Sequence, residues 1–151
     1  MDLFGHEDPE EYIVRRRQEM ERPTGFATHE ALKEAITSCS RCPLRREAGL
    51  GPVLSTGPAD APLMIVGEGP GGVEDDYGGP LIGPSGQLLD KALASVGITR
   101  DHVYVTNIVK CRPRGNRTPT MDEGHFCGSI WLLQEIALAR PAVIIGLGKV
   151  A

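Results

Sequence analysis

Three short apolar runs, each closed by glycine or polar residues, constrain most strongly how this chain can fold. They cover residues 62–67, 102–109 and 142–148, and their length and β-branched content predict buried strands. Helical patterns fill the two intervals between them. A strand–helix–strand–helix–strand order favours a parallel sheet covered on both faces, so we expect an α/β fold of three layers, αβα, around a short central parallel sheet.

The helical intervals carry their own start and stop signals. Ser85 can cap a helix that Gly97 closes, with apolar positions at Leu88, Leu89, Ala92, Leu93 and Val96. Thr120, with an acidic residue three positions later, fits a capping box for a long helix that runs to the next proline. A shorter amphipathic helix is expected over residues 28–37.

The distribution of charge separates the chain into two parts. Residues 1–30 hold eight acidic and four basic residues, which accounts for the whole net charge of −4. We therefore read residues 1–25 as a charged N-terminal extension with a helix over residues 10–21, and residues 26–151 as one domain. Residues 31–151 are neutral overall, so local basic clusters matter more there than the total. We expect neither a membrane span nor a secretory signal, since no apolar run is long enough and none follows a basic start.

Four cysteines form the strongest chemical signal. Cys39 and Cys42 are a tight pair, and Cys111 and Cys127 follow the second strand with fifteen residues between them. Thiolates suit zinc or an iron–sulfur cluster, and the split second pair favours the cluster modestly. Four unliganded buried thiols remain the alternative.

A glycine-rich loop follows the first strand over residues 67–75. It matches neither a phosphate-binding loop with Gly-Lys-Ser/Thr nor a dinucleotide fingerprint. Ligands of open α/β sheets bind beyond the carboxyl ends of the strands, where Glu68 or Glu74 can orient a water or stabilise a cation. Asn107 ends the second strand at the same edge and can present a donor and an acceptor to a base. The alternative for the glycine-rich loop is an acidic surface loop, and the alternative for Asn107 is a turn residue at the end of a strand.

Taken in order, these pieces resemble the family 4 uracil-DNA glycosylases. Residues 67–71, 74–75, 79–83 and 86–90 are similar to that family's first motif, and residues 105–113 and 115–117 to its next block. The resemblance implies that Cys39, Cys42, Cys111 and Cys127 ligate a structural 4Fe–4S cluster, with zinc as the alternative. The fold it implies is that of the uracil-DNA glycosylases.

The resemblance also assigns roles to single residues. Glu68 and Gly69 would take the water-activating position, and Asn107 would read the O4/N3 edge of uracil. Gly67, Glu74 and Leu81 would line the base pocket, with Glu74 near C5. A basic loop would meet the DNA backbone through Lys110, Arg112, Arg114 and Arg117.

Two departures from the family pattern bear on activity. Leu81 replaces a phenylalanine that stacks on uracil, and stacking on an aromatic ring is worth about 1–3 kcal/mol per base. No histidine matches the family's His-Pro motif, so the chain is expected to lack the last strand and helix.

The function expected is hydrolysis of the N-glycosidic bond of flipped-out uracil in single- or double-stranded DNA, as part of base excision repair. The alternative is a catalytically inactive iron–sulfur domain that binds DNA or a polymerase. We expect a monomer in the cytoplasm of a bacterium or archaeon, associated with the nucleoid.

Overall fold

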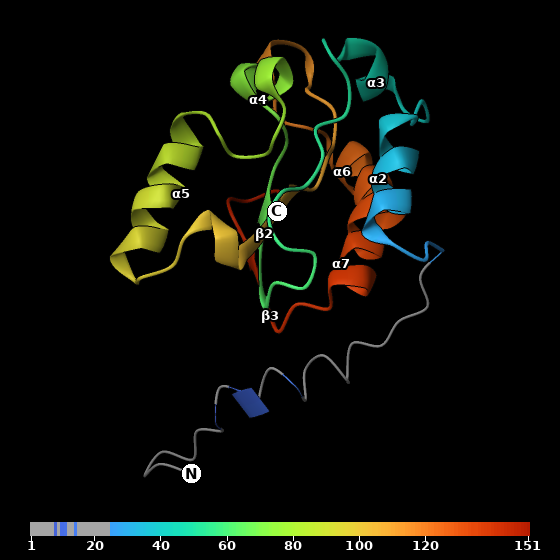
Figure 1. Ribbon diagram of the computed structural model, residues 1–151. Helices are drawn as coiled ribbons and strands as arrows, with labels where there is room; N and C mark the ends of the chain where they lie inside the picture. The colour runs from blue at the N-terminus through green and yellow to red at the C-terminus, as the bar shows by residue number, and fades with distance from the viewer. Residues whose placement is uncertain (1–7, 9, 12–13, 15–24) are drawn as a thin grey trace.

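The computed structural model describes residues 8, 10–11, 14 and 25–151. The helix expected over residues 10–21 lies largely outside the described residues. Within the described part, a small sheet stands between two groups of helices (Figure 1), which confirms the expected three-layer α/β fold. No helix in that part of the chain is long and apolar enough to cross a membrane.

The sheet has three parallel strands in the order β2-β1-β3. They are β1 (Leu63–Gly67), β2 (Val103–Asn107) and β3 (Val143–Gly146), so all three apolar runs form strands. The outer side of β2 is covered by an antiparallel bridge between Thr56 and Val105. All four residues of β3 are exposed, so the third apolar run forms a strand at the sheet edge but not the buried strand that was predicted.

The long helix predicted after β2 forms on one face of the sheet, but it is divided into separate segments. Thr120 caps α6 (Met121–Cys127), and the Glu123 carboxylate accepts the Thr120 N–H in return. A wider π turn, η3 (Gly128–Leu132), then leads into α7 (Leu133–Ala139). On the same side lie α2 (His29–Thr37), capped by Thr28, and the short α3 (Pro43–Glu47), which sequence analysis did not anticipate.

The opposite face carries α5 (Pro84–Ser95). Its N-cap residue and its buried apolar residues differ from those predicted. Gly83 occupies the N-cap and Pro84 the first turn, a position where proline's missing N–H costs nothing. Leu89 and Leu93 pack against the sheet, whereas Leu88 and Val96 are exposed.

Two short 3₁₀ turns and one short helix complete the fold. The turns are η1 (Arg100–His102), just before β2, and η2 (Arg114–Asn116), in the basic loop. The glycine-rich segment after β1 forms α4 (Gly72–Tyr77), where only a loop was expected. Alternation along β1 and β2 divides the core, with Met64 and Tyr104 packing toward α7 and Ile65 and Val105 toward α5.

Candidate functional site

The carboxyl ends of β1 and β2 lie side by side and form the floor of the candidate site. Gly67 is paired in register with Asn107. Beyond the strands, Ile108 N–H donates to the Gly67 carbonyl at 2.9 Å and Val109 N–H to the Glu68 carbonyl at 3.1 Å. The backbone of the predicted loop is therefore fixed at the edge of the sheet where α/β proteins bind ligands.

Gly67, Leu81 and Asn107 converge at this edge. A Cβ on Gly67 would lie 2.4 Å from Asn107 Oδ1 and 3.4 Å from both Leu81 methyl carbons, so only glycine fits. Asn107 is 2% exposed, and its Oδ1 has no hydrogen-bond partner among the described residues. A buried acceptor without a partner is costly, and a ligand with an N–H group would satisfy it.

Glu68 and Gly69 follow directly at the same edge. The Glu68 side chain is half-buried, and its carboxylate makes no hydrogen bond within the described residues. A Cβ on Gly69 would lie 2.6 Å from Val109 Cγ2, so this position also requires glycine. The carboxylate is thus available beside a tightly packed backbone.

The Glu74 carboxylate is held in place by hydrogen bonds that the sequence did not indicate. It stands in the first turn of α4, where Oε2 accepts the Gly71 N–H at 3.1 Å. Oε1 accepts the N–H groups of Ile82 and Gly83 at 3.2 and 2.9 Å. Three backbone donors therefore hold this buried carboxylate, which in turn fixes the loop that carries Leu81.

The same loop is clamped from the other side by Arg100, which sequence analysis missed. Its guanidinium donates to the carbonyls of Leu81 and Gly86 and to Asp90. Leu81 has φ 53°, a left-handed conformation that a non-glycine residue rarely adopts. No local pattern could have indicated this contact, because Arg100 is 19 positions from Leu81.

The four cysteines line one cavity together with apolar side chains. Cys39 and Cys42 come from the segment between α2 and α3, Cys111 from the loop after β2 and Cys127 from the end of α6. Leu44, Arg45, Pro52, Lys110, Phe126 and Trp131 complete the lining. Among the described residues, no group of three or more ligating side chains is close enough to hold a single metal ion.

The two buried thiols of the cysteine cavity are held in their protonated form. Burial, together with the neighbouring cysteines, raises the pKa of Cys111 to about 12. Burial likewise raises the pKa of Cys127 to about 11, against the lowering effect of a hydrogen bond from the Lys110 N–H. These thiols stay protonated at neutral pH unless a metal replaces the protons, and four cysteine sulfurs are the donor type that zinc sites and iron–sulfur clusters use.

The basic loop after β2 differs from the prediction in one residue. Lys110 was expected to contact DNA, but its side chain is 2% exposed and its ammonium pairs with Glu135 at 2.7 Å. A buried ammonium whose donors are already used cannot reach a phosphate, so that expectation is wrong.

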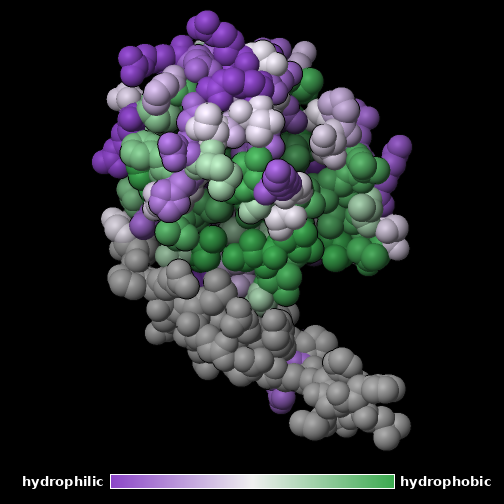
Figure 2. Space-filling view, turned by 180° about the vertical axis from the view of Figure 1, so that it is seen from behind, coloured by the Kyte–Doolittle hydropathy of each residue, from purple (hydrophilic) through white to green (hydrophobic). Residues whose placement is uncertain are grey.

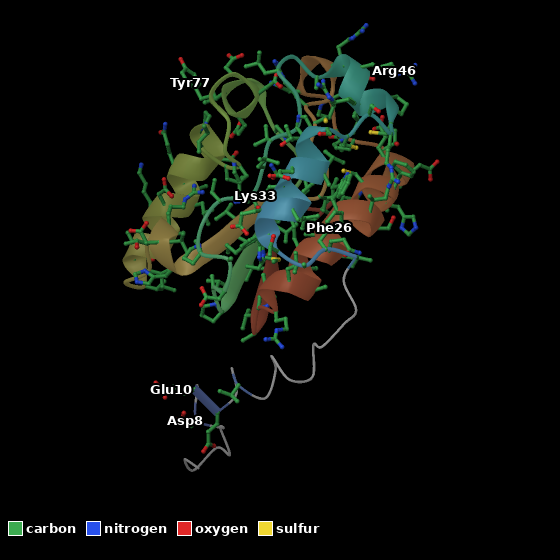
Figure 3. All side chains as sticks on the ribbon, turned by 45° about the vertical axis from the view of Figure 1, so that its right-hand side comes forward. Asp8, Glu10, Phe26, Lys33, Arg46 and Tyr77 are labelled. Atoms are coloured by element: carbon green, nitrogen blue, oxygen red, sulfur yellow. The ribbon has the colours of Figure 1, made fainter. Side chains whose placement is uncertain are left out.

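The three arginines of the loop lie nearer to solvent. Arg112 donates to Asn116 Oδ1, and Arg117 forms ion pairs with Glu47 and Glu123. Arg114 is exposed, and its backbone N–H donates to Glu47, which brings it close to α3. Figure 3 shows the α3 residue Arg46 at the same end of the molecule as Tyr77 of α4. Figure 2 shows that this end is largely hydrophilic.

Arg46 is thus a further basic residue that sequence analysis passed over. The run Arg45-Arg46 next to the Cys-x-x-Cys pair was the available signal.

Comparisons with known proteins bear on the whole arrangement. A sequence profile described as the uracil DNA glycosylase superfamily matches residues 54–151. The chain is 42% identical over 120 residues to the type-4 uracil-DNA glycosylase of Pyrobaculum aerophilum, which covers 80% of this chain and 60% of the relative. It is 43% identical over 122 residues to that of Thermotoga maritima, covering 81% and 62%.

A more distant similarity is to a viral protein. The chain is 36% identical over 102 residues to a DNA polymerase of Bacillus phage SP01, covering 66% of this chain and 11% of the polymerase. The chain spans about 60% of the length of the curated glycosylases that it matches. Since the superfamily profile covers most of the described domain, the chain belongs to the uracil DNA glycosylase superfamily.

Proposed function

We propose that this domain excises uracil from DNA by hydrolysing its N-glycosidic bond. The observation that carries the proposal is Asn107, a buried amide at the carboxyl edge of the sheet whose Oδ1 has no partner among the described residues. Uracil offers an N3–H next to the O4 acceptor. The amide oxygen would accept from N3 while the amide nitrogen donates to O4, a pairing that cytosine cannot reproduce.

The target base must leave the duplex stack to reach this site. Breakage of the C1′–N1 bond then leaves cationic character on the sugar and negative charge on uracil. A water that Glu68 orients, beside Gly69, would attack C1′, and its proton would end on the departing base. Glu68 supports this role because its carboxylate is not occupied within the described residues.

The pocket walls would select the base. Three backbone N–H groups fix the Glu74 carboxylate, so a rigid group would stand near C5 and oppose the methyl group of thymine. Gly67 would let the base approach the strand closely, and Leu81 would cover its face. An isobutyl group offers no aromatic face, so its stacking would be weaker.

The DNA backbone would lie across the end that carries α3 and the basic loop. Arg112, Arg114 and Arg117 remain proposed phosphate contacts, and Arg46 joins them because Arg114 is bonded to the same short helix. Such contacts would make binding salt-dependent although the net charge is negative. We further propose that the domain acts as a monomer on single- and double-stranded DNA.

The cysteine cavity would hold a 4Fe–4S cluster through Cys39, Cys42, Cys111 and Cys127. The all-sulfur donors and apolar lining support this assignment. When bound, the cluster would supply structural cross-linking and not redox chemistry. Absorbance near 400 nm after anaerobic purification, with iron and sulfide analysis, tests the assignment, and a colourless zinc protein would overturn it.

Uracil release tests the function. A labelled oligonucleotide with one uracil is incubated with the purified chain and cleaved with alkali at abasic sites. The wild-type chain is expected to produce the cleaved strand, and Asn107→Ala to lose it while keeping its melting temperature. A thymine oligonucleotide serves as the substrate control. A folded wild-type chain that releases no uracil would contradict the proposal.

The similarity to a phage polymerase favours a second candidate, a catalytically inactive iron–sulfur domain that binds DNA or a polymerase. This alternative predicts DNA binding by the folded chain with no uracil release and no preference for uracil over thymine. Fluorescence anisotropy with matched oligonucleotides separates the two functions.

A further inference from the structure

The ammonium group of Lys110 lies in the interior, between β2 and α7. Its Nζ donates hydrogen bonds to Thr106 Oγ1 at 2.6 Å, to the Asn107 carbonyl at 2.7 Å and to Glu135 Oε2 at 2.7 Å. All three donors of the ammonium are therefore used. The Glu135 side chain is 1% exposed, and its carboxylate also accepts the Thr106 hydroxyl.

Stability alone does not explain this arrangement. Removing two charges from water costs several kcal/mol per ion, and well-packed apolar residues in their place are often neutral or stabilising. Met64, Val66 and Tyr104 form an apolar cluster with Ile136 and Ala139 on this face of the sheet. The ion pair is better explained by what it holds in place.

Lys110 holds the end of β2 from both sides. Its side chain fastens the carbonyl of Asn107 to α7, and the residue also lines the cysteine cavity. Its carbonyl accepts the Val53 N–H at 2.7 Å. One residue thus connects the strand end that presents the Asn107 amide with the cysteine cavity.

We propose that Lys110, paired with Glu135, is a positioning residue that fixes the orientation of Asn107 for base recognition. The inference rests on the proposed function, because it assigns Asn107 to the base. Lys110 touches no substrate in this scheme. It acts through the Asn107 backbone, so its loss should impair the chemical step more than DNA binding.

The test compares single and double variants. Lys110→Met and Glu135→Leu each leave one buried charge unpaired and are expected to lower the melting temperature. The double variant removes both charges and is expected to recover most of that stability without restoring the anchor on Asn107. Leu93→Ala, in the core between β1 and α5, is the matched control for lost stability away from the network.

The position of the Asn107 side chain can be followed by NMR, which does not depend on uracil release. The chain contains two asparagines, Asn107 and Asn116, so selective ¹⁵N-asparagine labelling gives two side-chain amide signals. In the double variant we expect the Asn107 amide to shift or broaden while Asn116, bonded to Arg112, stays unchanged. Leu93→Ala should leave both in place.

Single-turnover uracil release gives the functional reading. The double variant is expected to be about 100-fold slower than wild type, with unchanged affinity for uracil-free DNA, because small misplacements of a reacting group cost that much. A folded double variant with the wild-type rate and an unmoved Asn107 signal would overturn the inference. A wild-type chain without uracil release would instead contradict the proposed function, and the amide signals would still decide the role of Lys110.

Discussion

At the scale of single residues, the candidate site is set by close approaches that leave no room for a side chain. Gly67 faces the amide of Asn107, and Gly86 faces the carbonyl of Leu81, where a Cβ would lie only 1.7 Å away. The first contact joins two strands that are far apart in sequence, and the second closes the turn that leads into α5. The glycines of the motif therefore serve packing at the pocket as well as turn formation.

Gly67→Ala should damage the pocket directly. The new methyl would overlap Asn107 Oδ1, and relieving this overlap should cost about 1–3 kcal/mol of unfolding free energy. We expect a lower melting temperature together with loss of uracil release. Gly124→Ala is the control, because its methyl makes only ordinary contacts with Ile108 and Val150 and lies within α6. Wild-type uracil release by Gly67→Ala would contradict the assigned pocket.

Leu81→Phe should raise the rate of uracil release. An aromatic ring at this position offers a face for the base, and base stacking is worth about 1–3 kcal/mol. The comparison is made by single-turnover kinetics, with Leu88→Phe on the exposed side of α5 as a control. An unchanged rate in the folded variant would mean that another group supplies the stacking.

At the scale of elements, the basic loop is held by ion pairs from Arg117, just after η2, to α3 and α6. Arg117 pairs with Glu123 at 2.8 Å and with Glu47 at 3.2 Å. The hydrogen bonds from Arg117 lower the pKa of Glu123 to about 2. The pKa of Glu47 is lowered mainly by the hydrogen bond from the Arg114 backbone N–H and further by the hydrogen bond and charge of Arg117. The loop is thus fastened to two helices, which leaves Arg114 presented to solvent.

The lowered pKa values predict how stability depends on pH. A carboxyl that binds its proton more weakly in the folded state stabilises the fold above its unfolded pKa and loses this effect as pH falls. Arg117→Gln should therefore melt at a lower temperature than wild type at neutral pH. The difference should vanish between about pH 4.5 and about pH 2.

Thermal unfolding across this pH range checks the prediction. Arg41→Gln is the control, because Arg41 lies over the Trp131 ring and forms no carboxylate pair within the described part of the chain. A difference for Arg117→Gln that persists at low pH would contradict the role of the ion pairs.

At the scale of the whole molecule, the cysteine cavity connects parts that the sheet alone leaves separate. Its four thiols come from the segment between α2 and α3, from the loop after β2 and from α6. The neighbouring apolar cluster includes Leu32 of α2, Leu44 of α3 and Trp131 of η3. A group bound to all four sulfurs would cross-link one side of the domain.

Removing the proposed cluster should therefore destabilise the fold. A ligand that binds only the folded state adds to its stability, and 1 kcal/mol corresponds to roughly 2–4 °C in a domain of about this size. Oxidation in the presence of a chelator should lower the melting temperature by more than about 5 °C as absorbance near 400 nm is lost. Cys39→Ser should resemble the metal-free protein. An unchanged melting temperature after complete iron loss would contradict the cross-linking role.

The sequence alone determined the local and periodic features of this domain. Apolar runs predicted the three strands, since buried parallel strands need continuous apolar residues, and the Thr120–Glu123 capping box is a contact between near neighbours. Tertiary structure decided what depends on distant partners. In the folded domain Lys110 is buried and paired with Glu135. The Glu74 carboxylate accepts three backbone N–H groups, and Arg100 donates to the Leu81 carbonyl. The sequence cannot distinguish a charged side chain on the surface from one paired with a buried counter-ion. The counter-ion belongs to an element that only the fold brings near.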